Sequence, residues 1–404
     1  MLRRPADPTR RRIVAAVALA AIMVVPSLMQ FALGTLGPFL TADLSLSRSD
    51  LGLVTGCFYL AAAVGSPVMG RMADTVGARV ASLLTVALAG LGVLFLSYSG
   101  SLLALLGGAL VGGAASAIAN PATNLAISTM PRPHAMLVGV KQSGVQAAAF
   151  LAGTLLPPIA LTTGWQGAFL ACAALCALAL PAAAAMPRAV PARPTVAARA
   201  PADGGARDGG DATVIRLAVY AALMGAGIAT TNTYLVLYAH ERVGLGVDTA
   251  GALLAAVGLC SVLARITATM LVERAADPQR AGVRMLTGMS AAGIMATSAI
   301  ALAQGLGPAA VWVGAIGIGL SASAFNGVAM MVVISTARSA AVARSSGRVQ
   351  GAFFGGLFLS PPLFGLLVDA TGAYAAGWSW TILCYCAATA VMVTAGLARH
   401  RQRP

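Results

Sequence analysis

Two positively charged side chains lie within apolar stretches of this sequence. Lys141, the only lysine among 404 residues, stands in the segment Gly-Val-Lys-Gln-Ser-Gly, and Arg265 stands eight residues before Glu273 in a run of mostly apolar residues. A buried positive charge is costly unless an anion accompanies it, and both side chains bind carboxylates and other anions through charge-assisted hydrogen bonds. These two residues therefore predict recognition of a negatively charged ligand.

The acidic residues of the chain do not supply that negative charge. None of the twelve Asp and Glu residues falls in the middle of an apolar stretch, so the partner of Arg265 must be a ligand or a backbone carbonyl. Exporters of cations, and symporters with an embedded proton carrier, usually need an acid at such a depth. Two other interpretations stay open: Arg265 could bridge helices through backbone carbonyls, and Lys141 could extend its ammonium to the membrane surface.

Uncharged polar residues accompany the two cations. Asn120 and Asn124 are four residues apart, as are Gln142 and Gln146, so each pair shares one face of a helix. The residues that we expect in the substrate-binding site are Arg265, Lys141, Gln142, Gln146, Gln30, Asn120, Asn124, Asn232, Tyr234 and Asn326. Each uncharged group could instead form a hydrogen bond between helices, which contributes about 0.6 kcal/mol on average in membranes.

The elements that hold these residues are membrane-spanning helices. Hydrophobic residues make up 58% of the sequence and charged residues 9%, and the mean hydropathy is +0.85, a composition outside the range of soluble domains. About 20 apolar residues cross a bilayer as a helix, and the uncharged runs predict six helices in each half of the chain. Two long runs, Val80–Pro131 and Gln142–Pro187, are each expected to cross twice, with turns at Ser97–Ser101 and Thr162–Trp165. We therefore expect an all-α membrane protein with twelve transmembrane helices.

The basic residues indicate orientation in the membrane rather than binding of nucleic acid. With the N-terminus in the cytoplasm, 21 of the 26 basic residues fall on cytoplasmic segments, which is the positive-inside pattern. The arginines near the N-terminus precede an apolar run that is too long for a secretory signal and lacks a clear cleavage site, so we expect an uncleaved first helix. The predicted location is a bacterial cytoplasmic (inner) membrane, with both termini in the cytoplasm.

The chain divides into two related halves. Residues 187–213 are rich in Pro, Ala and Gly without an apolar period, which is typical of a disordered linker. An offset of 204 residues aligns Val145-Gln146 with Val349-Gln350, and ordered matches near this offset indicate an internal repeat. We expect an N-terminal half (1–186) and a C-terminal half (214–404) in the same orientation, with a solute site between them, in a monomeric protein.

The loop between the second and third predicted helices carries a motif. Its residues, Gly70-Arg-Met-Ala-Asp-Thr-Val-Gly-Ala-Arg79, resemble the signature of the major facilitator superfamily in this loop. With the twelve spans and the central linker, the resemblance covers nearly the whole chain and implies two parallel six-helix halves with a gate that closes the cytoplasmic side. The predicted gating residues are Gly70, Arg71, Asp74, Gly77, Arg79, Glu273, Arg274 and Arg348. Gly70 would let two backbones approach closely, and Asp74 would lie at the positive end of another helix; the alternative is a positive-inside hairpin with a turn glycine.

The eighth predicted helix carries a second, shorter resemblance. Leu263-Ala264-Arg265, with Glu273 eight residues after the arginine, is similar to the monocarboxylate and oxalate/formate branches of the superfamily, which implies that Arg265 contacts a substrate carboxylate. The chain has Ser261 in place of an acid one turn earlier and no lysine in the first helix. The proton-coupling scheme of the monocarboxylate carriers is therefore not carried over.

These patterns predict a secondary transporter that moves a small organic anion, a carboxylate, by alternating access, as a symporter or an antiporter. The alternative is an efflux transporter for drugs or metabolites, although Gly153-Thr-Leu-Leu-Pro-Pro158 departs from the antiporter signature of the fifth helix, which has Gly-Pro followed by paired glycines. An enzyme is not expected, because the three histidines lie in loops or in the tail and no nucleophile, base or metal constellation accompanies them. The predicted partners are lipid and a small molecule, without a cofactor or metal.

Overall fold

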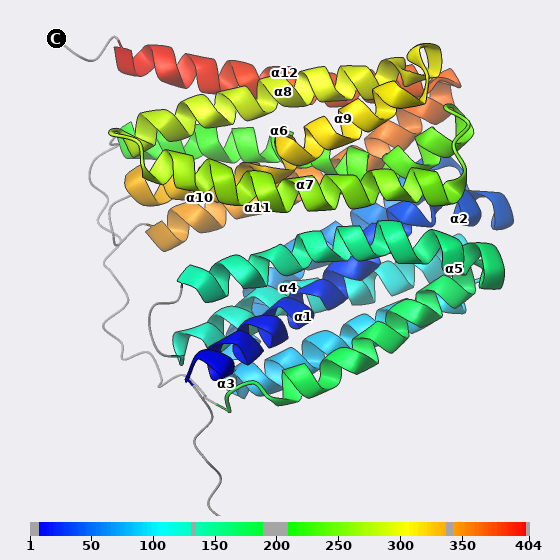
Figure 1. The fold of residues 1–404 in the computed structure, drawn as a ribbon, viewed down its shortest axis with the longest axis horizontal. Helices are drawn as coiled ribbons and strands as arrows, with labels where there is room; N and C mark the ends of the chain where they lie inside the picture. The colour runs from blue at the N-terminus through cyan, green and yellow to red at the C-terminus, as the bar shows by residue number, and fades with distance from the viewer. Residues whose placement is uncertain (1–7, 131–134, 189–208, 337–341, 401–404) are drawn as a thin grey trace, which may run out of the picture.

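The computed structural model describes residues 8–130, 135–188, 209–336 and 342–400, and no strand occurs among them. The helices are α1 (Pro8–Thr35), α2 (Gly37–Asp43), α3 (Arg48–Ser97), α4 (Leu102–Ser128), α5 (Ala135–Ala184), α6 (Gly209–Glu241), α7 (Val247–Glu273), α8 (Pro278–Leu306), α9 (Pro308–Leu320), the 3₁₀ turn η2 (Ala322–Ala324), α10 (Phe325–Thr336), α11 (Val342–Thr371) and α12 (Tyr374–His400). Figure 1 shows two bundles, α1 to α5 and α6 to α12. The expected all-α membrane fold is confirmed, while most of the predicted linker, 187–213, lies outside the described residues.

Ten helical stretches in the described part are long and apolar enough to cross a bilayer. Two of them, α3 and α5, have 50 residues each, about 75 Å of helix and more than twice the thickness of a bilayer core. Each contains one glycine in the left-handed region, Gly77 (φ 83°) in α3 and Gly164 (φ 75°) in α5, where glycine is favoured. Figure 1 shows α5 folded back on itself, and Gly164 lies in the turn predicted at Thr162–Trp165. Counting α3 and α5 twice gives the twelve crossings predicted from the sequence.

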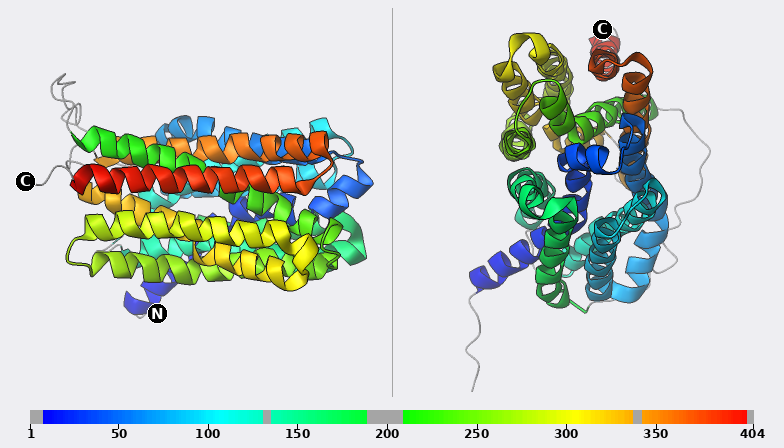
Figure 2. Two further views of the ribbon diagram at one scale, coloured as in Figure 1. Left: turned by 90° about the horizontal axis from the view of Figure 1, so that it is seen from above. Right: turned by 90° about the vertical axis from the view of Figure 1, so that its right-hand side faces the viewer.

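The two ends of the molecule are distinguished by the helix termini. At one end, which we call the linker end, α1 and α6 begin and α5 and α12 end (Figures 1 and 2). The short helix α2 lies at the opposite end, which we call the α2 end. The two bundles contact each other chiefly through α3 with α11, α5 with α7 and α1 with α6. A site between these helix pairs is bordered by both halves of the chain.

Glycines bring the two bundles into close contact toward the α2 end. A methyl group added to Gly52 of α3 would collide with the carbonyl oxygen of Pro361 in α11. One added to Gly251 of α7 would lie 2.7 Å from the carbonyl oxygen of Gly153 and 2.5 Å from Cγ of Pro157, both in α5. Small residues permit such backbone contact between membrane helices. The bundles are therefore tightly packed against each other at this end.

Candidate functional site

A cavity of about 500 Å³ lies between the two bundles. Its wall is formed by α1, α3, α4 and α5 on one side and by α6, α7, α11 and the segment from η2 to α10 on the other. Eight of the ten predicted binding residues line it, namely Gln30, Asn120, Asn124, Gln142, Gln146, Asn232, Arg265 and Asn326. The cavity runs from Gln30 and Asn232 in the interior toward Ser346, near the start of α11 at the linker end.

Arg265 lies in the cavity wall without an acidic partner. One of its terminal nitrogens donates to the carbonyl oxygen of Ser323 at 3.2 Å, and its Nε has no hydrogen-bond partner. Ser323 belongs to η2, where the break between α9 and α10 interrupts the α-helical hydrogen bonds. Within the described residues Arg265 forms no ion pair, and the residues that line the cavity include no Asp or Glu. The backbone bridge is therefore present through one nitrogen, while the charge itself is left uncompensated.

Lys141 lies one layer behind the cavity wall. Its side chain is 1% exposed, so it does not extend to the membrane surface, and its Nζ donates to Oδ1 of Asn124 at 2.5 Å. Asn124 is exposed and lines the cavity from α4, whereas Lys141 on α5 is not among the lining residues. The predicted wall position of Lys141 is therefore taken by Asn124.

Tyr59 is a site residue that the sequence does not single out. It lines the cavity from α3 and is 2% exposed. Its hydroxyl is buried beside the amides of Gln30 and Asn232, and neither amide is aligned with it for a hydrogen bond in this structure. Buried tyrosine hydroxyls usually have a partner, and the two neighbouring amides are the groups that can supply one. The flanking residues, Phe58 and Leu60, are apolar and carry no signal of a binding site.

The C-terminal half adds an aromatic surface to the cavity. Phe325, Phe353 and Phe354 line it, with ring centroids 5.5 Å apart between Phe325 and Phe353 and 6.0 Å apart between Phe353 and Phe354. The opposite wall presents mostly amides and hydroxyls. The cavity combines one positive charge, hydrogen-bonding groups and an apolar surface, an arrangement that suits an anion with an apolar body.

Tyr234 lies outside the cavity wall, unlike the seven predicted amide residues. Its hydroxyl is 2.7 Å from the carbonyl oxygen of Arg48 and 2.8 Å from that of Pro361. Its ring stacks on Phe364 with centroids 4.3 Å apart. Because these contacts join α6 to α3 and α11, Tyr234 belongs to the contact between the halves at the α2 end.

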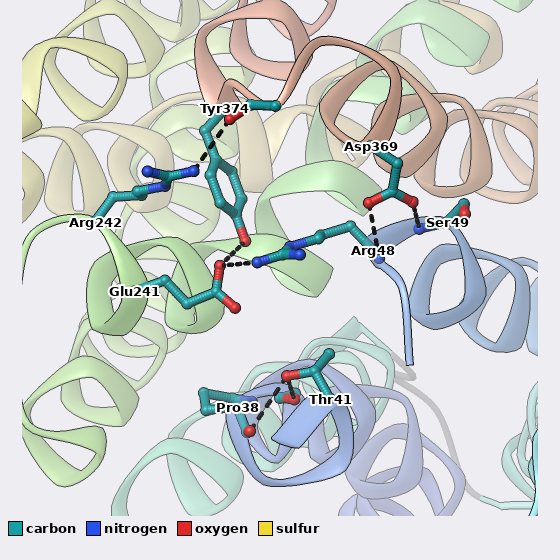
Figure 3. Close-up of polar contacts among 10 residues, drawn as sticks. Pro38, Thr41, Arg48, Ser49, Glu241, Arg242, Asp369 and Tyr374 are labelled. Atoms are coloured by element: carbon teal, nitrogen blue, oxygen red, sulfur yellow. Dashed lines mark hydrogen bonds and ion pairs between the residues drawn. The ribbon is translucent and has the colours of Figure 1, made fainter. Parts of the chain in front are cut away.

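A polar network crosses between the halves at the α2 end (Figure 3). Arg48 forms an ion pair with Glu241 at 2.8 Å, and the Tyr374 hydroxyl donates to the same carboxylate at 2.9 Å. The Asp369 carboxylate accepts hydrogen bonds from the backbone N–H groups of Arg48 and Ser49, at 3.2 and 2.8 Å, where the dipole of α3 favours a negative charge. The network ties the start of α3 to the ends of α6 and α11 and closes this end.

Four predicted gate residues at the linker end, Arg71, Asp74, Glu273 and Arg274, form no ion pair across the halves with any described residue of this structure. Asp74 and Arg71 are exposed, as are Glu273 and Arg274 at the end of α7. Where the chain is described, the ion pairs are Arg48 with Glu241 and Arg280 with Asp277, and neither includes a predicted gate residue. The two ends therefore differ, because inter-half polar contacts of the described residues gather at the α2 end.

The remaining predicted gate residues are Gly70, Gly77, Arg79 and Arg348. Gly77 forms the turn of α3, but a methyl group added to Gly70 would lie 4.0 Å from Cγ of Pro121, so the predicted close backbone approach is absent here. Arg79 is partly buried, and Arg348 is exposed beside a shallow apolar recess between α6 and α11. A gate formed by these residues stays a prediction for another conformation.

Comparison with known proteins identifies relatives. The family model described as Major Facilitator Superfamily matches residues 18–343. Human monocarboxylate transporter 11 is 26% identical over an alignment of 358 residues, and the match covers 86% of this chain and 74% of the human protein. A bacterial homologue of the human lysosomal transporter Spinster, in an inward-facing and occupied conformation, is similar in structure with a TM-score of 0.77 at 17% identity, over 97% of this chain and 98% of its own. The nucleoside transporter NupG gives a TM-score of 0.74 at 16% identity, over 95% and 99%; these two likenesses show the fold alone.

Proposed function

The chain belongs to the major facilitator superfamily, and we propose that it is a secondary transporter of a small organic anion, a carboxylate, that works by alternating access. The observation that carries the proposal is Arg265, the single charged residue among the described residues that line the cavity. A guanidinium in a membrane interior needs a counter-charge, and its planar fork binds a carboxylate with two hydrogen bonds. The name of the human relative, monocarboxylate transporter 11, supports the same class of substrate.

The other lining groups fit the rest of such an anion. Phe325, Phe353 and Phe354 offer an apolar surface to its carbon skeleton, and the amides of Gln30 and Asn232 offer hydrogen bonds to its polar substituents. Pockets of this kind bind through apolar contact and obtain orientation from a few polar groups. We therefore propose a substrate with one carboxylate, an apolar part and at most a few further polar atoms.

Alternating access requires that the closed end and the open end exchange roles. Transporters of this architecture rock one half against the other around a fixed site. In this protein the network around Arg48 and Glu241 would break, and contacts of the predicted gate around Asp74 would form. We place the linker end in the cytoplasm from the positive-inside pattern, which makes this conformation inward-facing in a bacterial inner membrane, with the protein acting as a monomer.

Export of apolar metabolites or drugs is the second candidate. The aromatic surface of Phe325, Phe353 and Phe354 favours it, since such a surface accepts many apolar bodies. Cationic drugs fit poorly, because Arg265 is positive and the described lining residues include no acid. Coupling by symport or by antiport against a second anion is compatible with the same site, and the direction follows from the gradients.

The test of the proposal is ligand binding by the purified protein. Pyruvate, lactate and benzoate are compared with the amides of the same acids by thermal unfolding, because a ligand that binds the folded state raises its unfolding temperature. We expect at least one carboxylate to stabilise the protein and its amide not to. Arg265→Gln should weaken binding of that carboxylate about ten- to a hundredfold, since a hydrogen bond to a charged group contributes about 1.5–3 kcal/mol.

Arg280→Gln is the matched control for this experiment. Arg280 lies on α8 and pairs with Asp277 at 3.2 Å, outside the cavity, so the same change of side chain should leave carboxylate binding as in the wild type. Uptake of the labelled acid into liposomes should be lost in Arg265→Gln and retained in Arg280→Gln. Stabilisation of the wild type by amides as strongly as by acids would contradict an anionic substrate.

A further inference from the structure

We infer that Lys141 is a positioning residue for anion recognition, which turns the amide of Asn124 so that an N–H donor faces the cavity across from Arg265. The inference rests on the proposed function, because it takes the ligand to be an anion. It accounts for a lysine that lies behind the cavity wall and touches no ligand site itself.

The surroundings of Lys141 give its ammonium little compensation. The side chain is 1% exposed and lies within a membrane-spanning part of α5. In the part of the chain that is described, its hydrogen bond to Asn124 is its one polar contact, and it takes part in neither ion pair. Burial of an ammonium carries a large desolvation penalty that a single neutral amide does not offset. A charged group in such a place is a candidate for function rather than packing.

The chemistry of the lysine determines how the Asn124 amide is oriented. An ammonium has three N–H donors and no acceptor, so the amide must turn its oxygen toward Lys141. The observed contact joins Nζ to Oδ1 at 2.5 Å. The NH₂ group then points away from Lys141, and Asn124 is an exposed residue of the cavity wall. A donor that faces the cavity, polarised by the positive charge behind it, suits an anion.

The depth of this donor is similar to that of Arg265. Lys141 lies six residues from the start of α5, and Arg265 lies eight residues from the end of α7, about 9 and 12 Å from the linker end. Asn124 belongs to the N-terminal half and Arg265 to the C-terminal half, and both line the cavity. An anion bound between them contacts both halves, so its binding can favour the conformation in which the halves approach each other.

Three variants separate positioning from packing. Lys141→Met removes the ammonium and keeps an unbranched side chain that is one atom shorter, and Lys141→Arg keeps a charged donor. Asn124→Asp keeps an acceptor for Lys141, and so keeps the link between α4 and α5, but has no N–H group for a ligand. Arg284→Met is the control, because Arg284 is an exposed arginine of α8, outside the cavity wall and outside the predicted gate.

The measurement is the dissociation constant of whichever of pyruvate, lactate and benzoate stabilises the wild type most, beside that of its amide. Lys141→Met should weaken carboxylate binding about tenfold, from the loss of one charge-assisted hydrogen bond. Asn124→Asp should weaken it at least as much, because it removes the same donor and adds a negative charge that repels the anion. Lys141→Arg should recover affinity to within about threefold of the wild type. Binding of the amide should change little in all three, and Arg284→Met should behave as the wild type.

Different results overturn the inference and the proposed function. Wild-type carboxylate affinity in folded Lys141→Met overturns the inference alone, and so does equal weakening of carboxylate and amide binding, which a packing role would produce. If Lys141→Met does not fold, Asn124→Asp decides, because wild-type affinity in that variant excludes the donor. If the wild type binds the amide as tightly as the acid, the proposed function and this inference both fail.

Discussion

Replacement of Lys141 by methionine should stabilise the ligand-free protein. The buried ammonium has one neutral partner, and exchange of buried ionic groups for apolar ones of similar volume is often neutral or stabilising by about 1–4 kcal/mol. We expect the unfolding temperature to rise by about 2 °C or more, measured by thermal unfolding without ligand, and Arg284→Met to leave it unchanged. A lower unfolding temperature would show that the lysine serves as a link between α4 and α5. Greater stability together with weaker anion binding is the result that a functional lysine predicts.

Residue types predicted most of the polar site, for a physical reason. Asn and Gln are costly in lipid, so those within apolar helices face the interior, and all seven predicted amides line the cavity. Aromatic residues carry no such constraint, because they also occur on surfaces that face lipid, and Tyr59 and Phe353 could not be selected. The prediction of Tyr234 as a binding residue was wrong, because a buried hydroxyl can instead donate a hydrogen bond to a backbone carbonyl of another helix, as Tyr234 does to Arg48.

Asp369→Ala should loosen the contact of α11 with the start of α3. Its carboxylate accepts from two backbone N–H groups, those of Arg48 and Ser49, and its charge is favoured by the helix dipole. If the two hydrogen bonds stabilise the closed state by about 1.4 kcal/mol, their loss lowers the ratio of closed to open molecules at the α2 end about tenfold. Distances between spin labels on the two halves at this end, in a cysteine-free background, should shift to longer values. Asp277→Ala, which removes an N-cap of α8 within one half, should leave these distances unchanged. Unchanged distances in Asp369→Ala would show that the contact of Asp369 with α3 has no role in closure.

Helices were predictable from charge and length, but their interruptions were not. The turn at Gly164 follows from a polar, glycine-containing sequence in an uncharged run that is too long for one crossing. The uncharged run from Ile13 to Thr41 predicts one helix, whereas the structure ends α1 at Thr35 and starts α2 at Gly37, with Pro38 in its first turn. The break at η2, which gives Arg265 its carbonyl partner, lies in an apolar run without proline. Local sequence does not mark it, because tertiary contacts can override helix propensity.

At the scale of the whole molecule, the repeat predicted two halves in one orientation, and the cavity lies between two bundles that carry the repeated segments. Which end is closed was not predictable from the sequence. Closure depends on a difference of a few kcal/mol between two packings of the same helices. The residues that form it, such as Glu241 and Asp369, lie at the ends of two separate helices, α6 and α11, and show no common pattern.

Gly251→Leu should hold the two halves apart at the α2 end. A methyl group at Gly251 would already lie 2.7 Å from the carbonyl oxygen of Gly153 and 2.5 Å from Cγ of Pro157, and overpacking of this kind costs about 1–3 kcal/mol, so the helices must separate. Hydrogen–deuterium exchange should then accelerate at the first amides of α3, which Asp369 protects in the closed form, and liposome uptake should fall. Gly288→Leu is the matched control, because Gly288 is exposed on α8 with nothing within 4 Å of an added methyl group. An unchanged exchange rate in Gly251→Leu would mean that the contact between α5 and α7 is not needed to close the α2 end. The contact between α3 and α11 would then hold this end closed without it.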